Sequence, residues 1–184
     1  MKALIVIDAQ NEFSPAGKRP VPGHAAIIEV IKDRAEDFRA AGLPIAWVRH
    51  FNKPNESPAF KPGTWGAEFT DGLGPKTGSE LEKEFHKSVY GAFTGSNIGQ
   101  WLKEKQVAEV LIMGFYTFGC VSTTTREAIM ADLTVYLEPE GTGACDIEHE
   151  LLGLMPSNEV RRSALLQLAA MGAIVYSHET VQKV

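Results

Sequence analysis

Cys120 lies where a cysteine can act as a nucleophile. It ends the apolar run VLIMGFYTFGC and is followed by VSTTTREAIMA, which is typical of a helix. The first turn of a helix presents unpaired backbone N–H groups and the positive end of the helix dipole, and both favour a thiolate over a thiol. The alternative interpretation is a buried structural cysteine, which is the commoner role for a lone cysteine. Its partners in the fold must decide between the two.

Two further reactive side chains, Asp8 and Lys87, lie at the ends of predicted strands. Asp8 directly follows ALIVI, and Lys87 alternates with Phe85 and Val89 in a half-apolar segment. Burying a carboxylate costs free energy unless it is paired or used. Taken singly, Asp8 also fits a helix cap and Lys87 an exposed edge lysine. We expect both to converge with Cys120, because the carboxyl ends of parallel strands meet at one edge of a sheet.

Short apolar runs alternate with segments of helical period along the chain. This alternation predicts an α/β protein: a three-layer α/β/α sandwich with a mostly parallel, six-stranded, Rossmann-like sheet. The predicted strands are 3–7, 45–48, 85–89, 110–114, 134–137 and 173–176. The predicted helices are 27–38, 96–105, 121–131 and 157–171, with a helical turn at 79–84 and a Gly-rich loop before the last helix. Residues 52–78 are rich in Pro and Gly without any period, which favours a functional lid or binding loop.

Composition narrows the class of protein. With 184 residues, of which 44% are hydrophobic, the chain predicts one globular domain over residues 1–184. A net charge of -5 without a basic block argues against nucleic acid and membrane partners. Asp8 closes the N-terminal apolar run too early for a signal peptide, and two cysteines are too few for a disulfide framework. We therefore expect a cytoplasmic protein.

Four segments carry a family resemblance. They are VIDAQNEF at 6–13, PGTWGAEF at 62–69, HKSVYGAFTGSNI at 86–98 and GFYTFGCVSTTTREA at 114–128. In order and spacing these segments are similar to the isochorismatase-like cysteine hydrolases, which include nicotinamidases, the amidohydrolases of carbamoylsarcosine, biuret and ureidoacrylate, and isochorismatase itself. The match is specific for the family and says little about the substrate.

The resemblance implies a catalytic triad of Asp8, Lys87 and Cys120. In these roles Asp8 accepts the thiol proton of Cys120 and later returns it to the leaving amine, while the Lys87 ammonium keeps Asp8 anionic and stabilises the thiolate. The resemblance also implies an oxyanion hole made by the backbone N–H groups of Tyr116 and Cys120, with a cis peptide bond between Phe115 and Tyr116. These residues predict attack on an amide-type carbonyl and a thioester intermediate.

A further set of residues is predicted to bind substrate, in a small pocket of apolar or aromatic character. Some belong to the segment around Asp8, others to the long loop or to the segment before Cys120, and for each the alternative is simple loop packing. The set is Gln10, Phe13, His50, Trp65, Phe115 and Tyr116, with Phe60 in support.

The chain departs from two branches of the family. Nicotinamidases bind a divalent metal through an Asp and two His soon after the second strand, whereas this chain has Val48-Arg49-His50-Phe51-Asn52 there. A metal site needs its full ligand set, so we expect no metal and no other cofactor. The remaining histidines, His24, His86, His149 and His178, show no ligand spacing. Isochorismatases cleave a vinyl ether by acid catalysis and lack the nucleophilic cysteine, so Cys120 argues against isochorismate as substrate.

The function predicted is hydrolysis of a C–N bond in a small amide, carbamoyl or ureido compound. Two alternatives stay open: a redox-sensing thiol with Cys145 as resolving partner, and a non-catalytic binding protein that has kept the fold. The resemblance also implies a homo-oligomer, either a dimer or a tetramer, and a small-molecule substrate whose identity the sequence leaves open.

Overall fold

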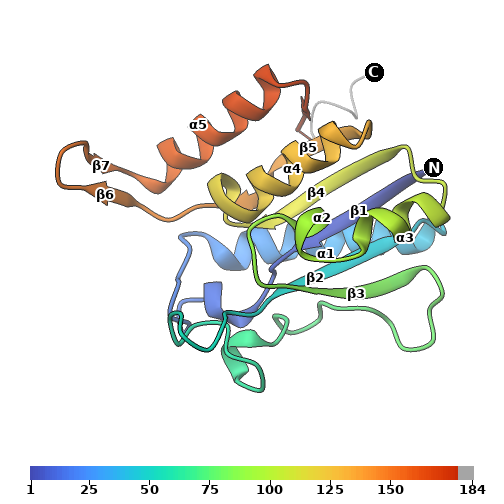
Figure 1. The fold of residues 1–184 in the computed structure, drawn as a ribbon, viewed down its shortest axis with the longest axis horizontal. Coiled ribbons are helices and arrows are strands. Elements are labelled where there is room, and N and C mark those ends of the chain that lie inside the picture. Colours follow the sequence, from blue (N-terminus) through green and yellow to red (C-terminus); the bar gives the residue numbers. More distant parts are fainter. Residues whose placement is uncertain (178–184) are drawn as a thin grey trace.

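The computed structural model describes residues 1–177 and is built around a six-stranded sheet whose strands are all parallel (Figure 1). The strands are β1 (Lys2–Ile7), β2 (Ile45–His50), β3 (Glu82–Lys87), β4 (Glu109–Phe115), β5 (Thr134–Gly143) and β8 (Ile174–Val175). Their spatial order is β3-β2-β1-β4-β5-β8, with every adjacent pair parallel. The predicted α/β class and the six-stranded sheet are confirmed.

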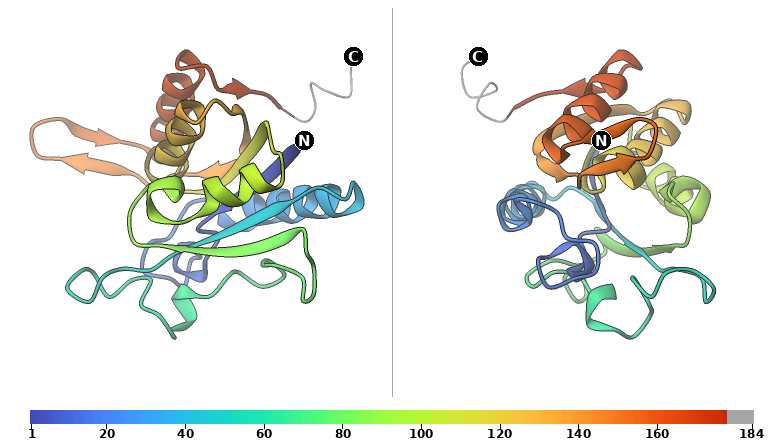
Figure 2. Two further views of the ribbon diagram at one scale, coloured as in Figure 1. Left: turned by 45° about the vertical axis from the view of Figure 1, so that its right-hand side comes forward. Right: turned by 90° about the vertical axis from the view of Figure 1, so that its left-hand side faces the viewer.

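Helices cover both faces of this sheet (Figures 1 and 2). One face is covered by α1 (His24–Ala40). The other is covered by α2 (Ala92–Gly95), α3 (Ile98–Glu104), α4 (Ser122–Met130) and α5 (Ser157–Ala170). The arrangement is the predicted three-layer sandwich. In the described part of the chain, no helix combines the length and apolar character needed to cross a bilayer.

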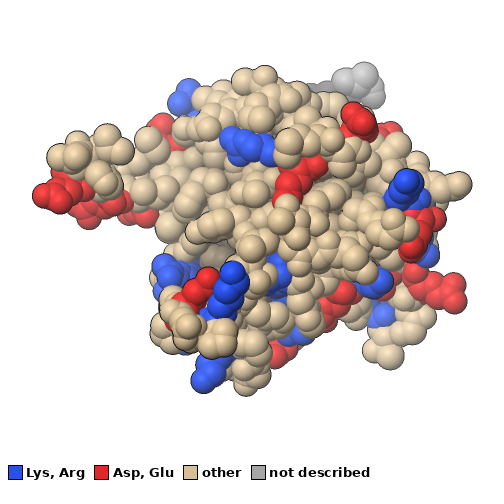
Figure 3. Space-filling view, in the orientation of Figure 1, with Lys and Arg blue, Asp and Glu red and all other residues tan. Residues whose placement is uncertain are grey.

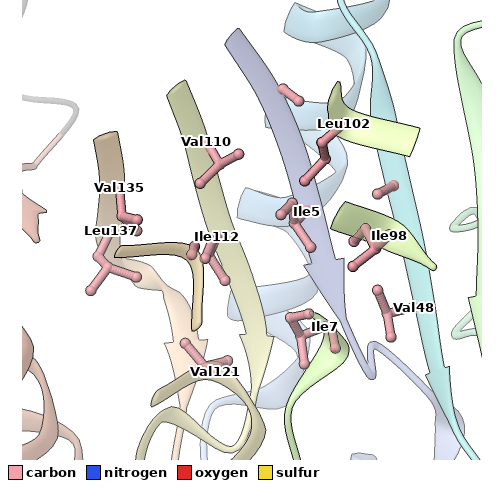
Figure 4. Close-up of a cluster of buried hydrophobic side chains, with 14 of the residues drawn as sticks. Ile5, Ile7, Val48, Ile98, Leu102, Val110, Ile112, Val121, Val135 and Leu137 are labelled. Carbon is pink, nitrogen blue, oxygen red and sulfur yellow. The ribbon is translucent and has the colours of Figure 1, made fainter. Parts of the chain in front are cut away.

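The central strand β1 shows why both faces are needed. Successive side chains of a strand point to opposite faces, so Ile5 and Ile7 pack into the cluster under α3, α4 and α5, whereas Leu4 and Val6 pack under α1. All four are fully buried. Figure 4 shows the first cluster, in which the strand residues meet side chains of α3. A continuous apolar run is therefore required, as expected for a parallel strand covered on both sides.

The predictions around β3 were wrong in their boundaries. The helical turn expected at 79–84 is absent, because β3 already begins at Glu82, whose carboxylate accepts hydrogen bonds from Arg39 and from the Trp47 indole. The strand ends at Lys87, two residues earlier than predicted. The short helix α2 was missed. Its first turn is held by the Glu127 carboxylate, which accepts the backbone N–H groups of Phe93 and Thr94 from far along the sequence.

A hairpin stands where a Gly-rich loop was predicted. Strand β5 continues to Gly143, and β6 (Ile147–His149) then pairs antiparallel with β7 (Gly153–Met155). Every residue from 146 to 156 is exposed, and Leu152 is 86% exposed. The hairpin projects from the body of the protein, and acidic side chains gather on it (Figure 3).

The strand order reverses between β1 and β4, and this is where α/β sheets form ligand sites. Gly114, near the end of β4, allows the two strands to approach each other there. Its φ of +123° lies outside the range that other residues adopt readily, and a Cβ at this position would lie 1.9 Å from the Ile7 carbonyl oxygen. Asp8 follows β1 and Cys120 follows β4, so both lie at the C-terminal edge of this junction.

Candidate active site

Asp8, Lys87 and Cys120 meet at the C-terminal edge of the sheet, where they come from the ends of β1 and β3 and from the turn after β4. Lys87 Nζ donates a hydrogen bond of 2.7 Å to Asp8 Oδ2, and both side chains are buried. A carboxylate oxygen of Asp8, the Cys120 Sγ and a ring nitrogen of His50 all lie within 4.8 Å of one another. The convergence expected from the strand ends is therefore present in the structure.

The backbone fixes the direction of each side chain. The Asp8 N–H donates to the Val48 carbonyl and so continues the pairing of β1 with β2, and Asp8 itself then adopts a left-handed conformation with φ of 54°. Lys87 is the last residue of β3, so its side chain points along the edge where β1 and β2 also end. Cys120 lies in a π-helical turn, Thr117–Val121, that runs directly into α4.

The Cys120 thiol is held in its protonated form. Burial raises the pKa of Cys120 and the nearby Asp8 carboxylate raises it further, whereas Lys87 opposes the rise. The sequence had suggested a stabilised thiolate at a helix N-terminus, and the structure corrects this. Burial also acts on Lys87, where it lowers the pKa, but the Asp8 carboxylate opposes this through its charge and its hydrogen bond, and the net shift is upward. The resting site therefore contains a thiol beside an ammonium–carboxylate pair.

One carboxylate oxygen of Asp8 is left to receive a proton. Asp8 Oδ2 is occupied by Lys87, whereas the buried Oδ1 has no hydrogen-bond partner among the described residues. A buried acceptor without a partner loses the free energy of a hydrogen bond, so such atoms are rare unless a ligand or a reaction step uses them. The arrangement can pass the thiol proton to Asp8 when the sulfur attacks.

His50 and Gln10 support this centre from the side of β2. His50 Nδ1 lies 3.2 Å from Lys87 Nζ, and its Nε2 lies 2.9 Å from Asn52 Oδ1. Burial lowers the pKa of His50 and the Lys87 charge lowers it further, so the imidazole is neutral near pH 7. The Gln10 amide accepts the His50 N–H and donates to the carbonyls of His50 and Ala67. Gln10 thus ties the end of β2 to the long loop.

A cavity of about 320 Å³ opens beside the thiol. Among the residues predicted to bind substrate, Phe13, His50 and Tyr116 line it, as does Phe60. The remaining lining residues are Asp8, Arg19, Tyr90, Phe118, Gly119, Cys120 and Cys145. The wall is mainly aromatic, which agrees with the expected pocket character.

Three predicted substrate-binding residues do not line the cavity. Gln10 is fully buried, and its amide is used up by the backbone contacts described above. Phe115 lies one layer deeper, where it stacks on Phe13 at 5.1 Å and on His24 at 5.5 Å. Trp65 is 56% exposed at a 3-10 turn, Trp65–Ala67, of the long loop. Sequence reasoning missed Arg19, Tyr90 and Cys145 as wall residues, although Tyr90 directly follows the predicted strand 85–89.

Two backbone donors lie beside Cys120. The Phe115–Tyr116 peptide bond is cis, as the resemblance implied. Among the turn, loop and cap hydrogen bonds of the described chain, none is donated by the N–H of Tyr116 or of Cys120. Tyr116 lies outside the helices and strands, so its N–H is free to donate to a developing oxyanion, whereas the N–H of Cys120 belongs to the π-helical turn.

Comparison with known proteins identifies the family. Residues 2–180 match the isochorismatase domain. The chain belongs to the isochorismatase family. The secreted isochorismatase effector of Verticillium dahliae is 32% identical to this family member over 144 residues, covering 78% of this chain and 73% of the relative. The nicotinamidase/pyrazinamidase of Mycobacterium tuberculosis is 31% identical over 173 residues, covering 78% of this chain and 91% of the relative.

A solved structure extends the comparison. The pyrazinamidase of Pyrococcus horikoshii, described in complex with zinc, has a TM-score of 0.81 and 26% identity, and the alignment covers 96% of this chain and 98% of that one. The relatives of this isochorismatase-family chain thus include proteins named as amidases and one named as a secreted isochorismatase effector. The cytoplasmic location and the homo-oligomer expected above stay predictions.

The residues of this family member do not suit a metal ion. Among those described, only Asp8, His50 and Cys120 place three potential ligand atoms close together, and the Lys87 ammonium already contacts both Asp8 and His50. After β2, where the nicotinamidase ligands are expected, His50 and Asn52 are bonded to each other. A cation between Asp8, His50 and Cys120 would face the Lys87 charge, and a cation at His50 and Asn52 would lack an acidic ligand. His178 lies outside the described residues.

Proposed function

We propose that this isochorismatase-family protein is a cysteine amidohydrolase that cleaves the C–N bond of a small amide, carbamoyl or ureido compound through a thioester. The observation that carries the proposal is the asymmetry of Asp8. One of its oxygens is held by Lys87 at 2.7 Å, and the other is buried and without a partner among the described residues. A carboxylate oxygen of Asp8 lies within 4.8 Å of the Cys120 Sγ. A base placed in this way serves a thiol that does not ionise by itself.

The first half of the reaction forms the thioester. Asp8 takes the thiol proton as Sγ attacks the substrate carbonyl carbon, so a C–S bond forms and the carbonyl oxygen becomes an oxyanion. The N–H groups of Tyr116 and Cys120 are the donors proposed for that oxyanion. When the carbonyl re-forms, Asp8 returns the proton to the leaving nitrogen and the C–N bond breaks. Ammonia or an amine leaves, and the acyl group stays on Cys120.

The second half restores the enzyme. Asp8, again a carboxylate, takes a proton from water as the water oxygen attacks the thioester carbon. The C–S bond then breaks, the proton passes to the Cys120 sulfur, and a carboxylic or carbamic acid is released. Lys87 keeps its proton throughout, because its charge is needed to balance Asp8 in both halves. A cavity of about 320 Å³ is at the lower end of the range for ligand sites, which fits a small substrate.

The direct test is release of ammonia from a panel of small primary amides and ureas by the wild-type protein, Cys120→Ala and Cys120→Ser. The panel contains benzamide, butyramide, 4-carbamoylbenzoate, methylurea and N-carbamoylglycine. We expect turnover of at least one compound by the wild type and none by either variant, with circular dichroism showing that both variants are folded. Full activity of a folded Cys120→Ala variant would exclude the covalent mechanism.

The redox alternative has one observation in its favour, since Cys145 lines the same cavity as Cys120. The state of the thiol argues against it. Sensor cysteines react as thiolates, whereas burial and Asp8 raise the pKa of Cys120. Under the hydrolase proposal, hydrogen peroxide should not produce a Cys120–Cys145 disulfide, and mass spectrometry of peptides from the oxidised protein tests this.

A further inference from the structure

Arg19 is a charged wall residue for which neither the fold nor the proposed chemistry supplies a partner. It lines the cavity beside Cys120, yet among the described residues its guanidinium takes part in no ion pair and donates no hydrogen bond. Most arginines of the described chain do have partners: Arg34 pairs with Glu138, Arg39 with Glu82 and Arg49 with Glu68. A cation at a cavity wall without an anion is a candidate for ligand binding.

The backbone around Arg19 is fixed relative to the reaction centre. Its N–H donates to the Glu12 carbonyl at 2.9 Å, and its own carbonyl accepts the Tyr116 hydroxyl at 3.2 Å. The Tyr116 side chain therefore links the segment before Cys120 to the backbone carbonyl of Arg19. The charge of Arg19 reaches that hydroxyl: burial and Cys145 raise the pKa of Tyr116, and Arg19 opposes the rise.

The charges of the cavity leave Arg19 unbalanced. Asp8 is the only acid in the wall, and its charge is cancelled by Lys87 at 2.7 Å. His50 is neutral, since burial and Lys87 lower its pKa. The rest of the wall is largely aromatic, with Phe13, Phe60, Tyr90 and Phe118 joining Tyr116. The unbalanced charge of Arg19, an exposed residue of this wall, therefore makes the cavity favour an anion over a cation.

We infer that Arg19 binds a carboxylate of the substrate, so that the preferred substrates are amides that also carry a carboxylate. Guanidinium and carboxylate are both planar and can form two parallel hydrogen bonds, which aligns the substrate as well as holding it. The aromatic wall between the two ends suits a flat or apolar spacer. This inference rests on the proposed amidohydrolase function and names its substrate class.

The test compares 4-carbamoylbenzoate with benzamide, which differ only in the carboxylate. Arg19 is an exposed residue of the cavity wall, and we expect the wild-type protein to prefer the charged amide by about tenfold in kcat/KM, as a hydrogen bond to a charged group provides. Arg19→Gln should remove most of this preference, mainly through KM for the charged amide, and Arg19→Lys should restore part of it. Arg162→Gln is the matched control, because it removes the same charge from an exposed position in α5 and should keep the preference.

Binding separates this inference from the proposed function. Cys120→Ala removes the nucleophile and keeps the cavity. Calorimetry should therefore show that Cys120→Ala binds 4-carbamoylbenzoate, and that the double variant with Arg19→Gln binds it about tenfold more weakly. Turnover of both amides at equal rates, or a preference that survives Arg19→Gln, would overturn the inference and leave the hydrolase proposal standing. Arg19-dependent binding without turnover of any amide would support the subsite and refute the hydrolase proposal.

Discussion

Replacing Lys87 by Met removes the ammonium of the buried pair while keeping most of the side-chain volume. The side chains of Lys87 and Asp8 are 0% and 1% exposed, so the carboxylate left behind cannot regain water. Its other oxygen already lacks a partner among the described residues. The change in the free energy of unfolding of this variant therefore reports how much the Lys87 ammonium stabilises the buried Asp8 carboxylate.

The magnitude follows from the distance. Two unit charges 2.7 Å apart attract by about 6 kcal/mol at an effective dielectric constant of about 20. The cost of burying both charges offsets part of this attraction, and removing one member of a buried pair usually costs about 3–5 kcal/mol. We expect Lys87→Met to lower the free energy of unfolding by that amount near pH 8. The loss should shrink in acid, where a proton can neutralise the lone carboxylate.

Urea unfolding followed by circular dichroism measures this loss, with Lys83→Met as the matched control. Lys83 is an exposed residue of the same strand, so its replacement should change stability by less than about 0.5 kcal/mol. Adding Asp8→Asn to Lys87→Met should recover part of the loss, because no lone charge then remains. The reasoning is refuted if Lys87→Met costs less than about 1 kcal/mol, or if the two substitutions are simply additive.

Three further outcomes follow from the structure. Asp8→Asn should stay folded but lower kcat by about 100- to 10,000-fold on any amide that the wild type cleaves, because the thiol loses its base; an unchanged kcat would remove Asp8 from the proton transfers. Burial lowers the pKa of both His24 and His50, so the unfolded chain takes up protons first as the pH falls below about 6.5, and stability should decrease between pH 7.5 and pH 5. His24→Gln should flatten that dependence in urea titrations, and an unchanged slope would contradict it. Gly114→Ala should cost about 2–4 kcal/mol in thermal or urea unfolding, since its Cβ would lie 1.9 Å from the Ile7 carbonyl oxygen; a stable variant would show that β1 and β4 can move apart.

The parts of the fold that depend on local pattern could be predicted. The apolar run of β1 identifies a strand covered on both faces, and the strand ends place Asp8 at the same sheet edge as Cys120. The parts that depend on distant partners could not. The hairpin of β6 and β7 carries no alternating pattern, and α2 is held by Glu127, a residue more than thirty positions away.

The state of the Cys120 thiol shows the same limit in energetic terms. The position before α4 suggested a thiolate, yet a helix terminus contributes only about 0.3–1 kcal/mol, which is less than one pKa unit. Burial can shift a pKa by about 3–5 units, and here Asp8 acts in the same direction. The sequence shows the helix but neither the burial nor the distance to Asp8. Arg19 was missed for a related reason, because its place in the wall depends on a contact with Tyr116, far away in the chain.

The central claim is that Cys120 carries the acyl group during hydrolysis. Intact-protein mass spectrometry of an acid-quenched single turnover tests it most directly, with a primary amide from the panel that the protein is found to cleave. We predict a transient mass increase equal to the substrate less ammonia, located by peptide mapping on Cys120 and absent from Cys120→Ala. Turnover of the amide with no adduct at any time, and with activity retained by a folded Cys120→Ala variant, would contradict the account.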